Sequence, residues 1–452
     1  MLIEKKVHLI LMSILLLLIL IGPASMMKLK MVLVAILMII CAYYFIKKRY
    51  EILISKKVFW WFIIYILSGV IWTCISLYHG NSGATNFVGI FLISPIIFMI
   101  FTVAISNTRY FQVINKVMII TTICIVIYNI LYTGVINIFP NLIGVPIPFI
   151  KENVGGINLG FIKFTAENIT CLTFLIPYVI TLYFLTKDEK DKKIYFIIAV
   201  LGIVNALLCA RTSFMLTIAI TPVLIIFVAY VTRINKTYFN IKEMIKTVAI
   251  CIGVVFLICL IFRIDLSLIW DKIEHSFNIS NSSINSDNGG YIRAQQFCDL
   301  IDTWKIKPIL GWGDAANALN VVRSDTEGLY ELSYVALLMQ RGLIGILIYI
   351  TQIIWVYKEN IKIIRENESL SKIACSAIVG YTAILLANAT NPYLYNFDRL
   401  FIFFYPLMII AQNDIDKNDR GSCYGWNNIS WRFRNKTLSS NKSNVKTNGT
   451  DI

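Results

Sequence analysis

The chain has 452 residues, of which 58% are hydrophobic and 15% are charged, and its formal net charge is +15. Soluble domains carry roughly 25% charged residues, so this composition excludes an ordinary soluble enzyme. Together with apolar runs of about 20 residues, it indicates a polytopic membrane protein. The positive charge lies in short stretches between apolar runs, which argues against nucleic-acid binding and fits the excess of Lys and Arg on the cytoplasmic side of membrane proteins.

About twelve apolar stretches are long enough to cross a membrane as helices. We place them near residues 7–25, 29–46, 58–78, 86–105, 114–133, 167–186, 193–210, 212–232, 246–263, 330–356, 373–389 and 399–412. The first stretch follows two lysines like a signal peptide but lacks a small-residue cleavage site, so we expect a retained helix. The expected fold is an all-α polytopic membrane protein with about 12 transmembrane helices.

The organisation that follows has four parts. Residues 1–263 hold the N-terminal transmembrane helices, 264–329 form one long extracytoplasmic loop, 330–412 hold the C-terminal helices, and 413–452 form a disordered cytoplasmic tail. Basic loops alternate with loops poor in positive charge, which places both termini in the cytoplasm. The exception is Lys28 with Lys30, which falls on the outer side. The turn at Arg211, the long loop and residues 388–399 are then outside.

Residues 134–166 contain three prolines and five glycines. We expect either a partly membrane-embedded loop, whose backbone must be satisfied by protein or a wet cavity, or an ordinary surface loop. The ten cysteines and three histidines form no metal-ligand spacing, and no phosphate-binding glycine loop, Ser-His-Asp set or HExxH motif occurs. We therefore expect neither a metal nor a cofactor.

Arg211 stands between two apolar stretches, VLGIVNALLCA and TSFMLTIAITPVL. A charge near membrane depth costs several kcal/mol, with roughly 2.5–3.5 kcal/mol as the low estimate, and usually marks a functional site. The alternative is that Arg211 caps a tight turn and extends its guanidinium to the membrane interface.

Two further arginines, Arg293 and Arg323, lie in the long polar loop. The planar fork of arginine binds phosphate oxygens through two hydrogen bonds, although a loop arginine is more often a solvated surface residue. Arg293 begins a stretch whose apolar residues recur at helical spacing: Phe297, Leu300, Ile301 and Trp304. We expect a helix that lies on the membrane surface and holds Arg293 over its plane.

A tight turn follows Pro308 and reads Gly311-Trp312-Gly313-Asp314. Its polar groups and backbone N–H groups are candidates for contacting an anion or a sugar, and Trp312 is a candidate for stacking on a sugar face. A purely structural turn is the alternative. A second glycine signal, Gly342 to Gly345, follows later in the chain.

Glu327 and Glu331 stand just before the apolar stretch that begins near residue 330. A carboxylate at the edge of the membrane can act as a general base for a sugar hydroxyl, and Glu331 is our candidate. It could instead be a helix N-terminal acid favoured by the helix dipole. Arg399 opens the last apolar stretch, where it is a candidate for lipid or sugar binding or for an ion pair with Asp398.

The order of these features resembles the O-antigen polymerase and O-antigen ligase superfamily of polytopic membrane glycosyltransferases. Ala210-Arg211-Thr212-Ser213 is similar to the family's Ser-Arg-Thr turn. Arg293, Trp304 and the run from Pro308 to Gly313 follow in the same order. Tyr334 to Gly345 is similar to the segment that leads into the family's Gly-Leu-Ile-Gly helix. The resemblance covers approximately residues 195–400.

The resemblance implies a GT-C-like fold, a glycan carried on undecaprenyl diphosphate, and transfer to an acceptor hydroxyl outside the bacterial cytoplasmic membrane, without metal or cofactor. It assigns Arg211 and Arg293 to the diphosphate. Ligases of the family often carry His-Asn where this chain has Glu331-Leu332, so a capsule or O-antigen polymerase is favoured. Its partners would be the lipid-linked oligosaccharide, membrane lipid, and a chain-length regulator and flippase of the same pathway. The alternatives are a ligase of finished polymer and a flippase of lipid-linked sugars.

Overall fold

The computed structural model describes residues 2–48, 52–108, 111–139, 152–158, 161–209, 211–233, 289–320, 327–420 and 430–432, with a few positions between 245 and 256. Within these ranges, eight helical segments are long and apolar enough to cross a membrane, and two shorter apolar helices accompany them. The prediction of a helical polytopic membrane protein is therefore confirmed. The count of about twelve spans stays a prediction, since most of residues 246–263 and residues 264–288 lie outside the described ranges.

The first group of helices is α1 (Leu2–Ile21), α2 (Met27–Lys48), α3 (Lys56–Tyr78), α4 (Ala84–Val88), the π-helical turn η1 (Gly89–Ile93), α5 (Ser94–Thr108), α6 (Phe111–Ile138), α7 (Ile169–Leu185), α8 (Glu189–Cys209) and α9 (Thr212–Thr232). The second group is α12 (Gly289–Ile306), α13 (Ser333–Glu366), α14 (Glu368–Asn388) and α15 (Phe397–Arg420). Each expected stretch other than 86–105 and 246–263 overlaps one of these helices, and 86–105 overlaps α4, η1 and α5, which follow one another without a break.

Two short antiparallel strand pairs accompany the helices. β2 (Glu152–Asn158) pairs with β3 (Phe161–Ala166) in a hairpin that opposes Glu152 to Ala166. β1 (Leu53–Ser55) pairs with β4 (Ser430–Arg432). Within residues 134–166, where we expected either a partly embedded loop or a surface loop, α6 runs to Ile138 and the end of the segment forms the hairpin. Whether this segment enters the membrane stays a prediction. Residues 140–151 lie outside the described ranges.

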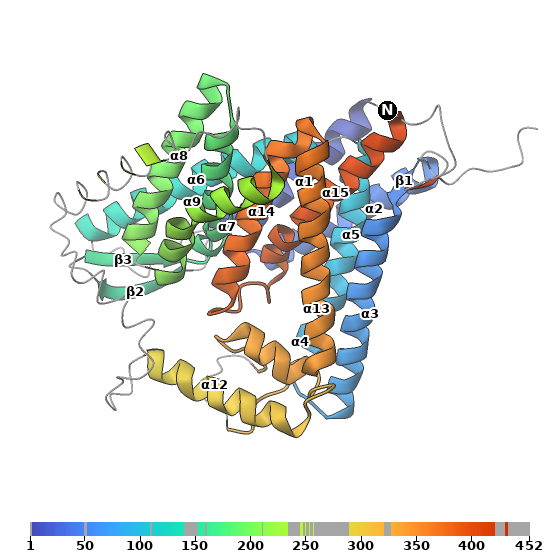
Figure 1. Ribbon diagram of the computed structural model, residues 1–452, viewed down its shortest axis with the longest axis vertical. Helices are drawn as coiled ribbons and strands as arrows, with labels where there is room; N and C mark the ends of the chain where they lie inside the picture. The colour runs from blue at the N-terminus through green and yellow to red at the C-terminus, as the bar shows by residue number, and fades with distance from the viewer. Residues whose placement is uncertain are drawn as a thin grey trace, which may run out of the picture.

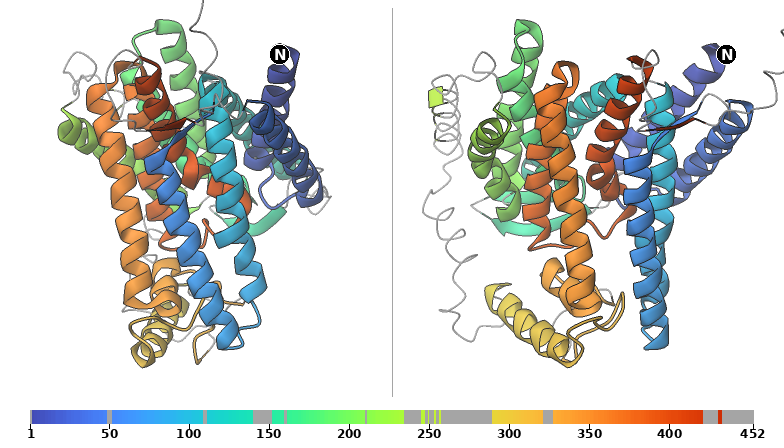
Figure 2. Two further views of the ribbon diagram at one scale, coloured as in Figure 1. Left: turned by 90° about the vertical axis from the view of Figure 1, so that its right-hand side faces the viewer. Right: turned by 45° about the vertical axis from the view of Figure 1, so that its right-hand side comes forward.

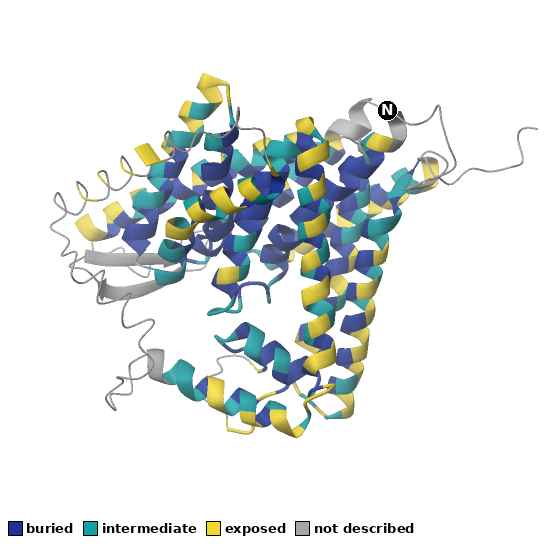
Figure 3. Cartoon of the chain, in the orientation of Figure 1, coloured by how far each residue is buried: buried dark blue, intermediate teal, exposed yellow. Residues whose placement is uncertain are grey.

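The centre of the bundle is formed by α7, α14 and α15 (Figure 1). α7 is apolar on every side and nearly all of its residues are buried, which is the behaviour expected of a helix enclosed by other helices. The outer helices instead turn apolar side chains outward, including Ile39, Leu131, Phe227 and Ile354, each more than half exposed (Figure 3). A hydrocarbon environment suits such a surface.

The connections between the helices lie at two ends of the bundle. At one end, here called the basic end, Lys57 pairs with Glu359 at 3.1 Å and Lys417 pairs with Glu366 at 2.9 Å. The opposite end, here called the cap end, includes residues 22–26, 79–83, 307–320, 327–332 and 389–396. Contacts between these segments tie the cap end together, among them the hydrogen bond from the Ala24 N–H to Asp398 at 2.8 Å and that from Asn81 to the Trp312 carbonyl at 3.0 Å.

Part of the cap end is built by the first turns of α13. This helix has 34 residues, or about 51 Å at 1.5 Å per residue, against a hydrocarbon thickness of about 30 Å. Its backbone leaves helical geometry at Gly342, where φ is 61° and ψ is −171°. The first turns, residues 333–341, therefore belong to a cap, across which α12 lies (Figures 1 and 2). The cap has its own small core, formed by Leu300, Ala316, Ala318, Tyr330, Ala336 and Met339.

The two glycine signals of the sequence contact one another. The Gly313 N–H donates to the Gln340 carbonyl at 2.8 Å, and the Leu343 N–H donates to the Pro308 carbonyl at 2.9 Å. Gly311 has a φ of +71°, and a Cβ there would clash with the Gln340 backbone. Glycine is required because the chain turns left-handed where two backbones touch.

Gly311→Ala is expected to destabilise the protein by at least about 2 kcal/mol, because a left-handed alanine is strained and its methyl group displaces backbone atoms. The thermal unfolding of the purified protein in detergent measures this loss. Gly134→Ala is the matched control, since Gly134 lies within α6 and a Cβ there meets no atom within 4 Å. Equal unfolding temperatures for the two variants would contradict the packing described here.

Candidate functional site

Arg211 and Arg399, both predicted as site residues, lie on the ring of Tyr393. The guanidinium carbon of Arg211 is 5.3 Å from the ring centroid and that of Arg399 is 5.7 Å from it. Both distances fall within the range of a cation–π contact. The Tyr393 hydroxyl is 3.1 Å from the Ser213 hydroxyl, which ties the segment 389–396 to the start of α9. We call Arg211, Arg399, Tyr393 and Glu167 the arginine cluster.

The local sequence explains how the two arginines reach the cap end. Arg211 is the extended N-cap residue of α9, with φ −96° and ψ 108°, in the short break that separates α8 from α9. Arg399 lies in the first turn of α15, after a loop pinned by the hydrogen bond from the Leu394 N–H to Asn388 at 2.9 Å. Each charge therefore stands where a helix begins at the cap end.

The arginine cluster carries an excess positive charge. Glu167 accepts a hydrogen bond from Arg399 Nη2 and forms an ion pair with it. Within the described part of the chain, no carboxylate pairs with Arg211, and the buried Nε of Arg399 has no hydrogen-bond partner. Glu167 pairs with Arg399 alone, so the two guanidinium groups are accompanied by one carboxylate among the described residues, and the cluster is a candidate site for an anion.

Asp398 does not form the ion pair with Arg399 that the sequence suggested. Its carboxylate instead binds Lys30 Nζ at 2.7 Å, and both side chains are almost fully buried. Lys30 also donates to the Gly22 carbonyl at 2.6 Å. This pair explains why Lys30 was the exception in the charge alternation. A lysine that is neutralised inside the bundle does not indicate on which side of the membrane its segment lies.

Arg293 and Glu331, predicted separately, form an ion pair of 2.7 Å. Arg293 projects from α12, confirmed as a helix, and Glu331 precedes α13, so the pair fastens the cap helix to the first turns of α13. The two side chains are 33% and 28% exposed, so solvent or a ligand has access to both groups. Arg323 and Asp325 lie outside the described residues.

The turn from Gly311 to Asp314 is not a free donor surface, which corrects its predicted role in substrate binding. Backbone carbonyls accept all four of its N–H groups, with Gly311 donating to Lys307, Trp312 to Met339, Gly313 to Gln340 and Asp314 to Trp72. The Trp312 indole donates to the Thr303 carbonyl at 2.9 Å. The Lys307 ammonium lies 3.9 Å from the Trp312 ring centroid, so one ring face is already occupied.

Asp314 forms a buried ion pair with Arg341, a residue that the sequence reasoning missed. Two parallel hydrogen bonds of 2.7 and 2.9 Å join them. Burial raises the pKa of the Asp314 carboxyl, and the guanidinium opposes that rise. The guanidinium carbon of Arg341 also lies 3.8 Å from the centroid of the Phe91 ring. The sequence could have indicated Arg341, because it is a charged residue within the apolar run VALLMQRGLIG. The same pattern drew attention to Arg211.

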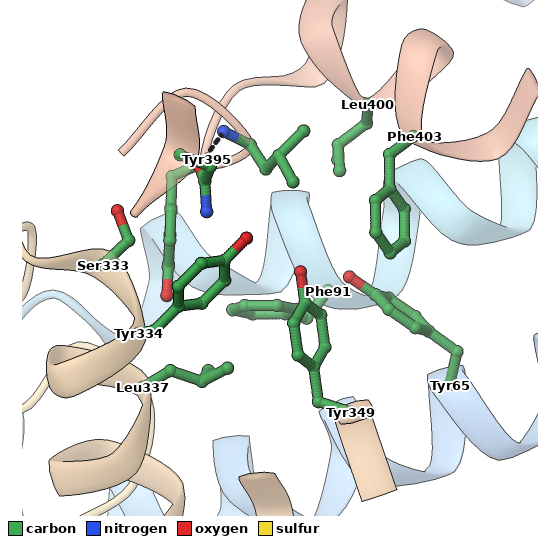
Figure 4. Close-up of a pocket in the computed structure, with 11 residues that line it drawn as sticks. Tyr65, Phe91, Ser333, Tyr334, Leu337, Tyr349, Tyr395, Leu400 and Phe403 are labelled. Atoms are coloured by element: carbon green, nitrogen blue, oxygen red, sulfur yellow. Dashed lines mark hydrogen bonds between the residues drawn. The ribbon is translucent and has the colours of Figure 1, made fainter. Parts of the chain in front are cut away.

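A pocket opens between the start of α13 and the loop 389–396 (Figure 4). Ser333, two residues after Glu331, lies on one side, and Tyr395, two residues after Tyr393, lies on the other. The Tyr334 hydroxyl donates to the Leu385 carbonyl at 2.8 Å and joins the two sides. Glu331 and Tyr393 are thus neighbours in sequence of residues on two sides of the pocket. Of the residues that line this pocket, the sequence had indicated Asn388 as suited to binding hydroxyls, but it did not single out Tyr65, Tyr349 or Tyr395, because tyrosines within apolar segments look like ordinary core residues.

Comparison with models of known protein families gives no match, and a search of curated proteins finds no relative. Among the described residues, no group of His, Cys, Asp and Glu side chains could hold a metal ion. The polar side chains of the candidate site include guanidinium, carboxylate and hydroxyl groups. They are suited to binding anions, to transferring protons and to hydrogen bonding with sugars.

Proposed function

We propose that this protein is a bacterial polysaccharide polymerase of the capsule or O-antigen type. It joins oligosaccharide repeat units carried on undecaprenyl diphosphate, with the cap end at the outer face of the cytoplasmic membrane. The observation that carries the proposal is the arginine cluster, in which Arg211 and Arg399 lie over one aromatic ring and only Arg399 pairs with a carboxylate among the described residues. A diphosphate is an anion that such a pair of guanidinium groups recognises.

In this proposal the reaction is a displacement at an anomeric carbon. The acceptor hydroxyl oxygen forms a bond to that carbon while the bond to the diphosphate oxygen breaks. Undecaprenyl diphosphate leaves with the electron pair, and Arg211 and Arg399 stabilise its developing negative charge. The acceptor proton passes to Glu331, a partly exposed carboxylate close in sequence to the pocket. Arg293 holds this carboxylate in position through the 2.7 Å ion pair.

Glu331→Gln tests the proposal directly. Purified protein in detergent is given undecaprenyl-diphosphate-linked repeat units, and the product lengths are resolved on a gel. The wild-type chain is expected to extend the repeat units, and Glu331→Gln to be roughly 10²–10⁴-fold slower, because glutamine keeps a hydrogen bond to Arg293 but accepts no proton.

Glu327→Gln is the matched control, because Glu327 belongs to the same segment but accepts a hydrogen bond from the Ser82 hydroxyl at 2.7 Å instead of pairing with Arg293. It should extend repeat units at close to the wild-type rate. Full activity in Glu331→Gln would assign the base elsewhere. A wild-type protein that moves lipid-linked repeats across vesicles but never lengthens them would replace the polymerase by a flippase.

A further inference from the structure

The cap carries an exposed apolar edge where the turn after Pro308 meets the kink of α13. Ile309 is 61% exposed and Leu310 is 48% exposed. The Leu343 N–H donates to the Pro308 carbonyl at 2.9 Å, and the next N–H of α13 donates to the Ile309 carbonyl at 3.1 Å. Leu343 and Ile344 are exposed as well. We call Ile309, Leu310, Leu343 and Ile344 the apolar edge. Large apolar side chains that are gathered and held in the open indicate a partner.

The apolar edge continues the outward surface of two helices that are long and apolar enough to cross a membrane. These helices, α3 and α13, run side by side to the cap end (Figure 2). Leu347 and Ile354 continue the exposed side chains along α13, and Leu77 is exposed on α3 (Figure 3). The Trp72 indole of α3 donates to the Leu310 carbonyl at 2.8 Å and holds the edge against that helix. The surface that suits hydrocarbon therefore extends from the two helices onto the cap.

The lengths of the two helices place this edge at the boundary of the hydrocarbon. Lys57 and Glu359, paired at 3.1 Å, mark the basic end of both helices. From this pair, α3 reaches Tyr78 after about 32 Å and α13 reaches Leu343 after about 24 Å, at 1.5 Å per residue. The hydrocarbon core of a bilayer is about 30 Å thick. A hydrocarbon layer that begins at the ion pair therefore ends near Tyr78, an exposed aromatic residue of the kind found at membrane interfaces, and it encloses Leu343.

A cation stands next to the apolar edge. The Lys307 ammonium lies 3.9 Å from the centroid of the Trp312 ring and contacts His79 Nε2, while His79 Nδ1 is 3.0 Å from the Trp312 carbonyl oxygen. In the part of the chain that the structure describes, no carboxylate pairs with Lys307, whereas Lys305 is paired with Asp302. Lysines at the ends of membrane spans extend their ammonium groups to the headgroup level, where the anionic partner is a lipid phosphate.

We propose that the apolar edge is inserted into the membrane leaflet at the cap end, and that Lys307 binds the phosphate of a phospholipid whose acyl chains cover Ile309 and Leu310. The occupant is lipid rather than a protein segment, because the edge is continuous with the hydrocarbon-facing surface of α3 and α13. This contact holds the cap at a fixed depth, and with it α12 and the Arg293–Glu331 pair. It does not depend on the proposed polymerase and would serve a flippase equally.

The reactivity of a cysteine at the edge tests the insertion. The full-length Ile309→Cys protein, in nanodiscs of phosphatidylglycerol and phosphatidylethanolamine, is treated with a charged methanethiosulfonate reagent, and each cysteine peptide is followed by mass spectrometry. The chain supplies both references, since Cys298 is exposed on the cap helix α12 and Cys74 is exposed on α3, one turn before Tyr78. Residue 309 is expected to react roughly tenfold more slowly than Cys298 and about as slowly as Cys74, because hydrocarbon excludes the charged reagent and disfavours the thiolate. A rate equal to that of Cys298 would overturn the insertion.

The unmodified chain provides a second measurement should Ile309→Cys fail to fold. Nanodiscs are prepared with a phosphatidylglycerol that carries a photoactivatable diazirine on one acyl chain, and the cross-linked residues are located by mass spectrometry after illumination. Cross-links are expected at residues 309–310, as on the exposed faces of α3 and α13, but not at residues 298–302 of α12. Cross-links on α3 and α13 that are absent from residues 309–310 would contradict the proposal.

Lys307→Gln tests the headgroup contact. Native mass spectrometry counts the phosphatidylglycerol molecules that the full-length protein retains in detergent, and this variant is expected to retain one fewer than the wild type, because it loses a charge-assisted hydrogen bond to phosphate. Lys305→Gln is the matched control, since the Lys305 ammonium already bonds to Asp302 at 2.8 Å, and it should retain the wild-type number. An unchanged number in Lys307→Gln would remove the phosphate from the proposal.

Discussion

Arg211→Ala is expected to slow polymer elongation by roughly 10²–10³-fold, the usual cost of removing one donor that stabilises a developing negative charge. The leaving diphosphate gains charge as its bond to the sugar breaks, and Arg211 is the cation of the cluster that no described carboxylate neutralises. Arg211→Lys keeps the charge but loses the planar fork, so it should fall between alanine and the wild type. Elongation of purified lipid-linked repeat units provides the measurement.

The same helix offers a matched control. Arg233 is the C-cap residue of α9, at the basic end, so it shares the helix and the charge of Arg211 but not its position. Arg233→Ala should leave elongation near the wild-type rate. Polymer of normal length made at the normal rate by Arg211→Ala would remove the arginine cluster from the mechanism and, with it, the main support for a polymerase.

Asp314→Asn is expected to destabilise the protein by about 3–5 kcal/mol, because it leaves the buried guanidinium of Arg341 without its counter-ion. Arg341→Met should cost less. Burial already raises the pKa of the Asp314 carboxyl, so the carboxyl can take up a proton when the guanidinium is absent, whereas a guanidinium cannot lose one. The free energy of unfolding in detergent measures both losses.

An exposed pair supplies the comparison. Lys305 and Asp302 form an ion pair of 2.8 Å with side chains 63% and 69% exposed, and Asp302→Asn should cost less than about 1 kcal/mol. The double variant Asp314→Leu with Arg341→Met should recover much of the lost stability, since no buried charge remains. A double variant less stable than either single variant would show that the pair itself, rather than the unpaired charge, holds the cap.

The sequence predicted those parts of the fold that depend only on the length of an apolar stretch. Stretches such as 58–78 and 212–232 became α3 and α9 almost residue for residue, because a span must satisfy its backbone internally and therefore forms a helix. The hairpin of β2 and β3 was missed, since its residues have neither a clear alternation nor a helical period. The kink at Gly342 was visible as a glycine signal, but its contact with Gly311 depends on a tertiary approach.

The sequence predicted individual residues of the candidate site, but it did not predict which of them pair with one another. Charge bias alone placed Arg211 and Arg399 on one side, and the structure brings both to Tyr393. Nothing in the sequence indicated that Arg293 meets Glu331, 38 residues away, or that Asp314 meets Arg341, 27 residues away. Ion pairs of this kind are set by how helices pack, and a single sequence carries no record of that packing.

The buried pair of Lys30 and Asp398 joins residues 368 positions apart, and this separation has a consequence for biogenesis. During synthesis the α1–α2 hairpin enters the bilayer long before Asp398 leaves the ribosome. The Lys30 ammonium must wait, hydrated or at the membrane surface, until α15 arrives to neutralise it. We therefore expect this ion pair to form only when α15 packs onto the bundle, so a chain cut short before residue 397 would carry Lys30 without its Asp398 partner.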